Sequence, residues 1–171
     1  MPVFRFEDKS AISLVACLIA NLSAFALDFA ARQKIGGQNL NFFVVEQFPV
    51  IPPQTYKSEF HAILLKDFIR ERVLELCYTA HDLKGFAEDM GYDGPPFAWD
   101  DERRLHLKCQ LDALYFHLYK LTRDDAAEIL ETFPIVKRQD EENYGSFRTK
   151  ELVLAYYNAY DAGNMDAWVK G

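Results

Sequence analysis

The sequence predicts a mainly α-helical domain with a small β element near the N-terminus. Three observations support this: apolar residues recur at helical steps along most of the chain, capping residues precede several of these runs, and residues 41–48 are as rich in Phe and Val as a buried strand. The chain has 171 residues, and 50% of them are hydrophobic. One well-buried domain is therefore possible, and a disordered protein is excluded.

The first part of the chain is expected to form one long helix and one strand. Residues 3–6 alternate apolar and charged side chains, as a short strand end does. A helix should then run from about residue 9 or 10 to about residue 35, where Gly36 and Gly37 shape the exit. Its expected core face consists of Leu14, Leu18, Leu22, Phe25 and Phe29.

Residues 41–48 form the predicted strand, which Pro49 closes before the stiff Pro52-Pro53 linker. Its apolar side chains are assigned to the core rather than to stacking on bases: Phe42, Phe43, Val45 and Phe48.

Helices dominate the remainder of the chain. Ser58 can cap a helix that reaches about residue 79, a short helical piece covers residues 81–90, and residues 92–99 form a Gly-Pro loop. Asp100 can cap the next helix, whose packing stripe is Leu107, Leu111, Leu114, Leu118 and Leu121.

The last third of the chain is expected to contain two helices and a charged loop. Thr122 and Asp125 form a loose capping box for a helix that ends at residues 132–134. Residues 137–145 are expected to be a charged loop, and a final helix covers about residues 148–160.

The net charge of −7 argues against a free-standing nucleic-acid binder. Residues 1–56, however, sum to zero, so the rest of the chain carries all the excess acid. An anion-binding surface is therefore expected towards the N-terminal part. The three cysteines are widely spaced and indicate reduced core thiols in a cytoplasmic protein rather than disulfides or a zinc site.

Residues 11–30 are apolar enough to suggest a membrane span or a signal peptide. The flanking charges are mixed, and Ser13, Asn21, Ser23 and Asp28 interrupt the run. A buried amphipathic helix is the preferred interpretation, so no contact with a membrane is expected.

No catalytic or metal site is predicted. The four histidines are not spaced to place two ligands on one helical face, no Gly-x-Ser-x-Gly motif occurs, and the Gly36-Gly37 pair lacks the context of a phosphate-binding loop. The paired acids at 100–101 and 124–125 adjoin helix starts, where they complement the helix dipole. The acids at 141–142 lie in the expected charged loop.

The segment 32–53 offers the side chains that contact DNA. Guanidinium, ammonium and amide groups occur together in its first part: Arg32, Gln33, Lys34, Gln38, Asn39 and Asn41. By composition alone this signal is weak, because polar loops commonly follow helices.

The order of residues in 22–53, from Leu-Ser-Ala-Phe-Ala-Leu-Asp through Lys-Ile-Gly-Gly-Gln-Asn-Leu-Asn-Phe-Phe to Pro-Val-Ile-Pro-Pro, is more informative. It resembles the target-recognition region of large restriction-modification enzymes with an N6-adenine DNA methyltransferase, including single-chain type II enzymes and phage-defence methylases. More loosely, it is similar to the end of a target-recognition domain in type I specificity subunits. Residues 111–119, 121–125, 128–138 and 144–152 resemble the C-terminal end of the same methylases.

The resemblance implies a non-catalytic piece of such an enzyme. The family binds S-adenosylmethionine through a glycine-containing motif and acts through Asn-Pro-Pro-Tyr or Asn-Pro-Pro-Phe, and neither occurs here. Gly94-Pro95-Pro96-Phe97 has Gly in place of the required Asn, and no nuclease motif is evident. The cofactor is thus implied only for the parent enzyme, with or without an attached endonuclease.

The expected organisation is a C-terminal part of a target-recognition domain at 1–53 and a helical region at 54–171. The expected partners are double-stranded DNA and the methyltransferase domain of the parent or of a split-gene partner. The residues expected to face DNA are Arg32, Lys34, Gln38, Asn39 and Asn41, with Lys137, Arg138, Arg148 and Lys150 as a second basic group. The alternative is a helical interaction module that contacts its parent enzyme without binding DNA.

Overall fold

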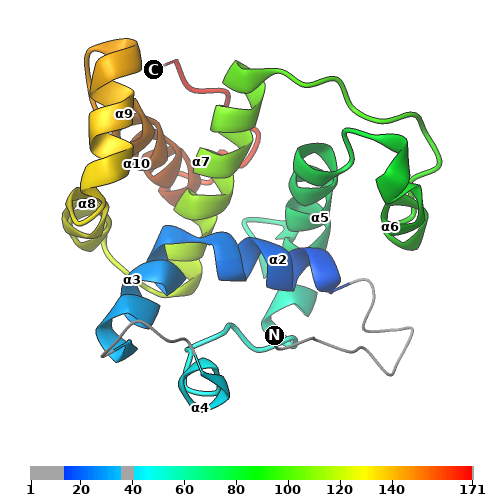
Figure 1. The fold of residues 1–171 in the computed structure, drawn as a ribbon, viewed down its shortest axis with the longest axis horizontal. Coiled ribbons are helices and arrows are strands. Elements are labelled where there is room, and N and C mark those ends of the chain that lie inside the picture. The colour runs from blue at the N-terminus through cyan, green and yellow to red at the C-terminus, as the bar shows by residue number, and fades with distance from the viewer. Residues whose placement is uncertain (1–13, 36–40, 171) are drawn as a thin grey trace.

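The computed structural model describes residues 14–35 and 41–170. The chain folds mainly into helices, and a two-residue-long antiparallel hairpin is the β element among the described residues (Figure 1). The predicted fold class is therefore confirmed. The helices and strands are α2 (Val15–Ser23), α3 (Phe25–Lys34), α4 (Phe42–Val45), β1 (Glu59–Phe60), β2 (Ile63–Leu64), α5 (Leu65–Cys77), α6 (Lys84–Asp89), α7 (Asp101–Leu118), α8 (Arg123–Glu131), α9 (Pro134–Tyr144) and α10 (Arg148–Asp161), with short 3-10 turns at Thr55–Lys57 and His81–Leu83.

Helix α7 forms the centre of the core. It packs against α10, α5 and α3, and four consecutive residues from Ala113 to Phe116 are completely buried, so the helix is covered on all sides at this level (Figure 1). Asp100 accepts a hydrogen bond from the Arg103 backbone N–H, as predicted for its cap. The predicted stripe is buried at Leu107, Leu111 and Leu114.

The C-terminal helices follow the prediction at α8 and α10 but not between them. Thr122 and Asp125 form the complete capping box of α8. The loop predicted at 137–145 is wrong, because α9 covers this region. Pro134 occupies the first turn of α9, where its missing N–H costs nothing, and Gly145 ends the helix at φ 79°. Pro134, which we interpreted as the end of α8, is therefore also the first residue of α9.

The long N-terminal helix is broken. Its α2 and α3 halves meet at Ala24, whose backbone is extended, and their axes differ by 65°. No single described helix is long and apolar enough to span a membrane, although this bent pair passes by length and composition. The break changes the buried face, so Leu22 is exposed. Most of the apolar residues that this helix pair buries are small, with Leu27 as the larger exception: Ala16, Cys17, Ala20, Ala24, Ala26 and Ala31.

The strand predicted at 41–48 is wrong. Asn41 caps the short helix α4 by accepting a hydrogen bond from the Val44 N–H, at 3.0 Å. The core assignment also fails for Phe42 and Phe43, which are 66% and 70% exposed, while Val45 and Phe48 are half-buried. Aromatic density alone does not make a strand, because a strand needs a neighbour with which to pair.

The hairpin lies instead at 59–64, inside the segment predicted to be helical. Two residues with positive φ, His61 and Ala62, form its turn, and Phe60 pairs with Ile63. Ser58 does not cap a helix, since its hydroxyl donates to the Thr55 carbonyl. Helix α5 consequently begins only at Leu65.

A buried polar network joins the segments before and after Pro53. The Asn21 side chain donates to the Tyr119 hydroxyl and accepts from the Ile51 backbone N–H, both at 2.8 Å. The Tyr115 hydroxyl donates to the Cys17 carbonyl at 2.8 Å. Residues on both sides of position 53 share one hydrophobic core. The boundary predicted there remains a prediction.

Candidate functional site

The first group of predicted DNA-contacting residues lies at the end of α3. Arg32 and Lys34 are exposed in its last turn. Arg32 donates two hydrogen bonds to Asp28, at 3.0 and 2.7 Å, and these raise its pKa. Its guanidinium also lies 4.5 Å from the centre of the Phe133 ring. The Arg32 side chain is therefore held in place by an ion pair, whereas Lys34 has no ion pair within the described part of the chain.

The other members of this group are only partly visible in the structure. The Asn41 side-chain oxygen is used by the cap of α4, which leaves its amide N–H groups for other contacts. Four residues lie outside the described ranges: Gly36, Gly37, Gln38 and Asn39.

The second basic group is largely ion-paired. Lys137 and Lys150 converge on Glu131, at 2.9 and 2.5 Å, and their hydrogen bonds lower the pKa of that carboxyl. Arg148 pairs with Glu102 and lies over the Tyr144 ring at 4.6 Å. Three of the four cations in this group are therefore neutralised by carboxylates and do not form a cluster of unpaired positive charge.

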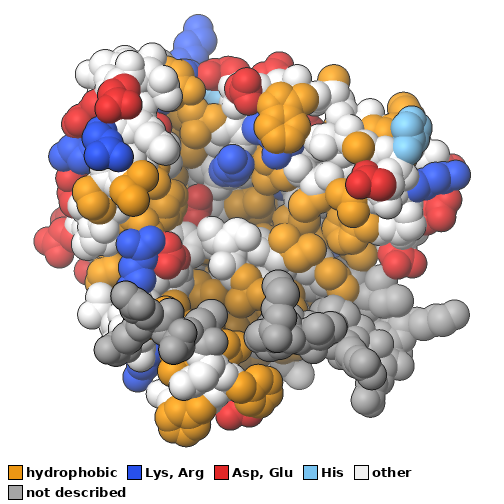
Figure 2. Space-filling model, in the orientation of Figure 1, with side chains coloured by type: hydrophobic (Ala, Val, Ile, Leu, Met, Phe, Trp, Pro, Cys, Tyr) orange, Lys and Arg blue, Asp and Glu red, His pale blue; other side chains and the backbone are white. Residues whose placement is uncertain are grey.

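Arg138 is exposed and lacks an ion pair among the residues described. Figure 2 shows Lys and Arg side chains mixed with Asp and Glu on the displayed face, without a continuous basic patch.

The two groups nevertheless approach the same part of the fold. Arg32 rests on Phe133, two positions after Glu131, on which Lys137 and Lys150 converge. The junction of α8 and α9 thus lies beside both groups.

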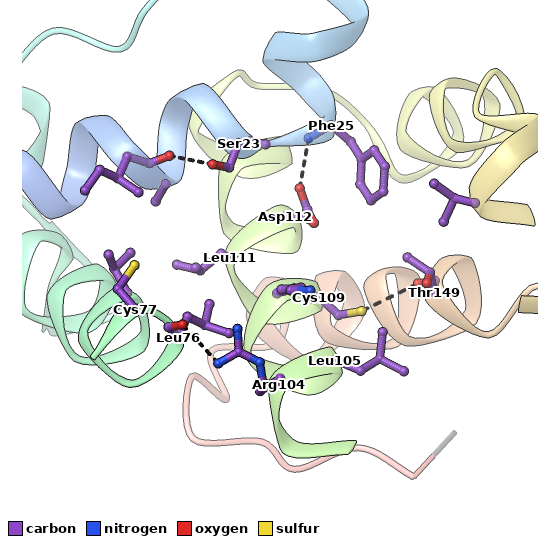
Figure 3. A pocket seen from close by; sticks show the side chains of 16 residues that line it. Ser23, Phe25, Leu76, Cys77, Arg104, Leu105, Cys109, Leu111, Asp112 and Thr149 are labelled. Carbon is purple, nitrogen blue, oxygen red and sulfur yellow. Dashed lines mark hydrogen bonds between the residues drawn. The ribbon is translucent and has the colours of Figure 1, made fainter. Parts of the chain in front are cut away.

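A cavity of about 450 Å³ lies between α2, α5, α7, α9 and α10 (Figure 3). Its walls are mainly apolar, with contributions from Ile19, Val73, Leu76, Leu105, Leu111 and Val136. Three cavity residues carry charge: Asp112, Lys108 and Arg104. Volume and lining are those of a small-molecule site.

Asp112 is the buried acid of this cavity, with 8% of its surface exposed. One carboxyl oxygen accepts a hydrogen bond of 2.9 Å from the Phe25 backbone N–H, at the start of α3. No described cation lies within 4.0 Å of the carboxyl, since the ion pairs of the described residues do not include it. Burial raises the pKa of Asp112 to about 7, although the Phe25 N–H and Lys108 oppose the shift.

The two cations of the cavity have other environments. Arg104 donates to the Leu76 carbonyl at 2.9 Å, and its guanidinium lies 3.7 Å from the centre of the Trp99 ring. Lys108 is exposed to solvent on α7. Neither therefore compensates the Asp112 charge by direct pairing.

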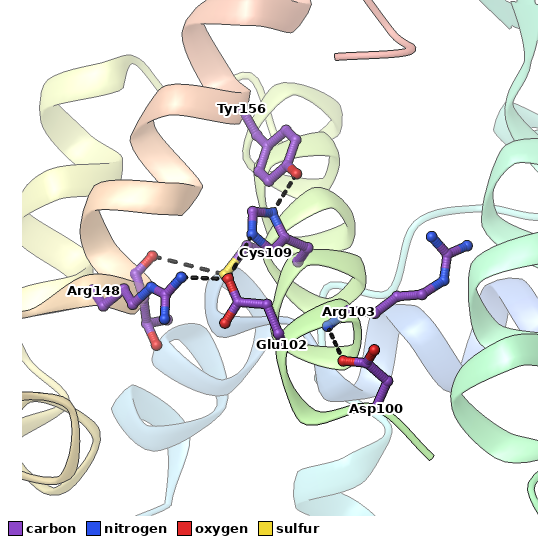
Figure 4. A network of polar contacts seen from close by, with 8 residues as sticks. Asp100, Glu102, Arg103, Cys109, Arg148 and Tyr156 are labelled. Carbon is purple, nitrogen blue, oxygen red and sulfur yellow. Dashed lines mark hydrogen bonds and ion pairs between the residues drawn. The ribbon is translucent and has the colours of Figure 1, made fainter. Parts of the chain in front are cut away.

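A second polar cluster surrounds His106, which is only 2% exposed (Figure 4). Its Nδ1 lies 2.6 Å from the Tyr156 hydroxyl, its Nε2 lies 3.2 Å from a Glu102 oxygen, and its ring stacks on Trp168. Both ring nitrogens are thus occupied, so this cluster ties α7 to α10 and to the C-terminal segment.

The described residues contain no group of three His, Cys, Asp or Glu side chains that could hold a metal ion. All three cysteines are free thiols. Burial raises the pKa of Cys17 to about 12 and also raises the pKa values of Cys77 and Cys109. These thiols are therefore poor nucleophiles at neutral pH.

Asp112 was missed as a site residue in the sequence. It lies next to Leu111 and two positions before Leu114, within the leucine stripe of the predicted helix. An acid on an apolar helix face was the available signal.

Comparisons with protein-family models, with curated proteins and with solved structures give no match for this chain.

Proposed function

We propose that this chain is a non-catalytic C-terminal segment of an N6-adenine DNA methyltransferase of the restriction-modification or phage-defence kind, and that it helps to bind and position duplex DNA. The proposal begins with the resemblance to such enzymes of residues 22–53, 111–119, 121–125, 128–138 and 144–152. S-adenosylmethionine and the methyl transfer belong to the parent's catalytic domain.

One structural observation carries the proposal furthest: the two resembling stretches pack on each other. Phe25 contacts the Phe133 ring edge-to-face, with ring centres 4.6 Å apart, and Arg32 covers the same ring. The Tyr119 hydroxyl donates to the Pro49 carbonyl at 2.9 Å. The two segments that resemble one family thus pack together, as parts of a single domain would.

The proposed DNA-facing surface is the exposed end of α3, with Arg32 and Lys34, continued by Asn41. The cations suit phosphate oxygens and the amide suits base edges. Lys137, Arg138, Arg148 and Lys150 are a weaker second contact, because Glu131 and Glu102 already pair with three of them.

The test is binding of the full chain to a labelled nonspecific duplex at low and at moderate salt. We expect salt-sensitive binding, and the Arg32→Ala, Lys34→Ala double variant should flatten the salt dependence by about one unit of slope for each lost phosphate contact. The control is Lys84→Ala, Lys170→Ala, which removes the same charge from exposed positions elsewhere. No detectable binding at low salt would contradict the DNA role and favour the second candidate.

The second candidate is a helical module that docks on other domains of its parent. The exposed aromatic side chains of α4, Phe42 and Phe43, favour it (Figure 2). The measurement is binding to a separately expressed adenine-methyltransferase polypeptide of the parent. Phe42→Ser with Phe43→Ser should weaken that complex at least tenfold if the rings are interface anchors. Undiminished binding would exclude α4 as the docking element.

A further inference from the structure

We infer that the cavity between α2, α5, α7, α9 and α10 binds a small amphipathic amine, with the ammonium group at Asp112 and the apolar body along the cavity walls. This site is independent of the proposed DNA role. Nothing at the exposed end of α3 is required for it.

The first argument is that Asp112 carries an ionisable group although its hydrogen bond to the Phe25 N–H requires only a neutral acceptor. The Phe25 N–H needs one acceptor oxygen, which an Asn side chain would also provide. A buried carboxylate without a paired cation costs stability that an amide would not. A ligand with a positive charge would pair with the carboxylate and offset this cost.

The second argument is that Asp112 has an oxygen available to a ligand. Only one of its oxygens has a hydrogen-bond partner among the described residues. Among the described residues, the Tyr160 hydroxyl is the one side-chain polar atom that is both fully buried and without a hydrogen-bond partner. The unbonded Asp112 oxygen is not in that class, so part of its surface is accessible. Since Asp112 lines the cavity, that oxygen is available there (Figure 3).

The third argument concerns the rest of the ligand. A cavity of about 450 Å³ with aliphatic walls accommodates an apolar body of drug-like size. Leu105 of α7 and Val136 of α9 both line the cavity, so apolar side chains from two helices can contact the apolar chain of the ligand.

The fourth argument distinguishes an amine from an acid. Arg104 lies eight positions before Asp112 on α7, about 12 Å along the axis, and is engaged by Leu76 and Trp99. Lys108 lies one turn before Asp112 and lowers the pKa of its carboxyl, but its ammonium is solvent-exposed and forms no ion pair with Asp112 among the described residues. A ligand carboxylate beside Asp112 would meet a second carboxyl group with no cation in direct contact, whereas an ammonium would pair with Asp112.

The experiment compares three probes that share one apolar body: phenylbutylamine, phenylbutanol and phenylbutyrate. Each is titrated into the full chain and followed by two-dimensional amide NMR. The Phe25 amide signal reports directly on Asp112, because its N–H donates to that carboxyl. We expect the amine to bind about tenfold more tightly than the alcohol and to move the Phe25 signal, since a charge-assisted hydrogen bond is about 1.4 kcal/mol better than a neutral one.

Variants separate the site from general effects. Asp112→Asn keeps the bond to Phe25 and should remove the preference for the amine. Asp140→Asn is the matched control, because Asp140 is also buried and caps a backbone N–H, that of Thr149, but does not line the cavity. Leu105→Trp should fill the cavity and abolish binding of amine and alcohol alike.

Thermal unfolding of each variant checks that it remains folded. Equal binding of amine and alcohol, tightest binding of the acid, no binding of any probe at millimolar concentration, or equal effects of Asp112→Asn and Asp140→Asn would each overturn the inference.

Discussion

The interface between the bent α2–α3 pair and α7 contains two buried polar side chains that differ in how fully they are bonded. Asn21 is completely buried and uses its oxygen and its amide group in bonds to Ile51 and Tyr119. Asp112 uses one oxygen for Phe25 and lines a cavity with the rest of its carboxyl. Both polar atoms of Asn21 therefore have hydrogen-bond partners within the fold, whereas Asp112 keeps one oxygen without a described partner beside the cavity where we propose that an amine binds.

The largest expected change in stability concerns Asn21, the more fully bonded of the two side chains. Asn21→Ala leaves the Ile51 N–H and the Tyr119 hydroxyl without their buried partner and should lower the free energy of unfolding by about 3 kcal/mol. Chemical denaturation measures this.

Asn158→Ala is the control for Asn21→Ala, because Asn158 is exposed on α10 and should change stability by less than about 0.5 kcal/mol. Equal stabilities of the two variants would show that the Asn21 network does not stabilise the fold.

A smaller effect of opposite sign is expected on the cavity side. The pKa of Asp112 is raised from 3.8 to about 7, so the folded state holds this proton more tightly than the unfolded state. Stability contributed by this group therefore falls as the pH rises through that range. Asp112→Asn should raise the free energy of unfolding by about 1 kcal/mol at pH values above 7, and it should have little effect near pH 4.

Asp125→Asn provides a control of opposite sign for this measurement. Hydrogen bonds from Thr122 lower the pKa of Asp125, so its contribution is present above its unfolded pKa and is lost as the pH falls. Thermal unfolding at several pH values should show this variant losing stability where Asp112→Asn gains it. A loss of stability for both variants at neutral pH would mean that the Asp112 carboxylate is not a cost to the fold.

Local signals predicted much of the fold correctly. The caps at Asp100 and at Thr122 with Asp125 are set by neighbouring residues and can be recognised in the sequence. The start of α10 at residue 148 was also predicted, although no side chain caps it and the Thr149 N–H donates to Asp140, nine positions earlier. The failures have tertiary causes. The bend at Ala24 is accompanied by a hydrogen bond from the Phe25 N–H to Asp112, which is far away in the sequence. No strand among the described residues pairs with residues 41–48.

The candidate sites were predictable to different degrees. Arg32 and Lys34 are exposed, as charged residues in the last turn of a helix commonly are, and their contact with DNA stays a prediction. The pairing of Lys137 and Lys150 with Glu131 could not be predicted from the sequence, because it brings together residues of three helices, α8, α9 and α10. The cavity likewise depends on helices that are far apart in the sequence, and only the acid within the α7 leucine stripe indicated it.

The bond between Asp112 and Phe25 lies at the first residue of α3. Phe25 and Arg32 are seven positions apart, about two helical turns, so they lie on the same side of α3 and both reach Phe133. One extra residue between them would rotate Arg32 by about 100° relative to Phe25 and remove it from that ring. The direction of this cation is therefore fixed by the number of residues after the bend as much as by its own contacts.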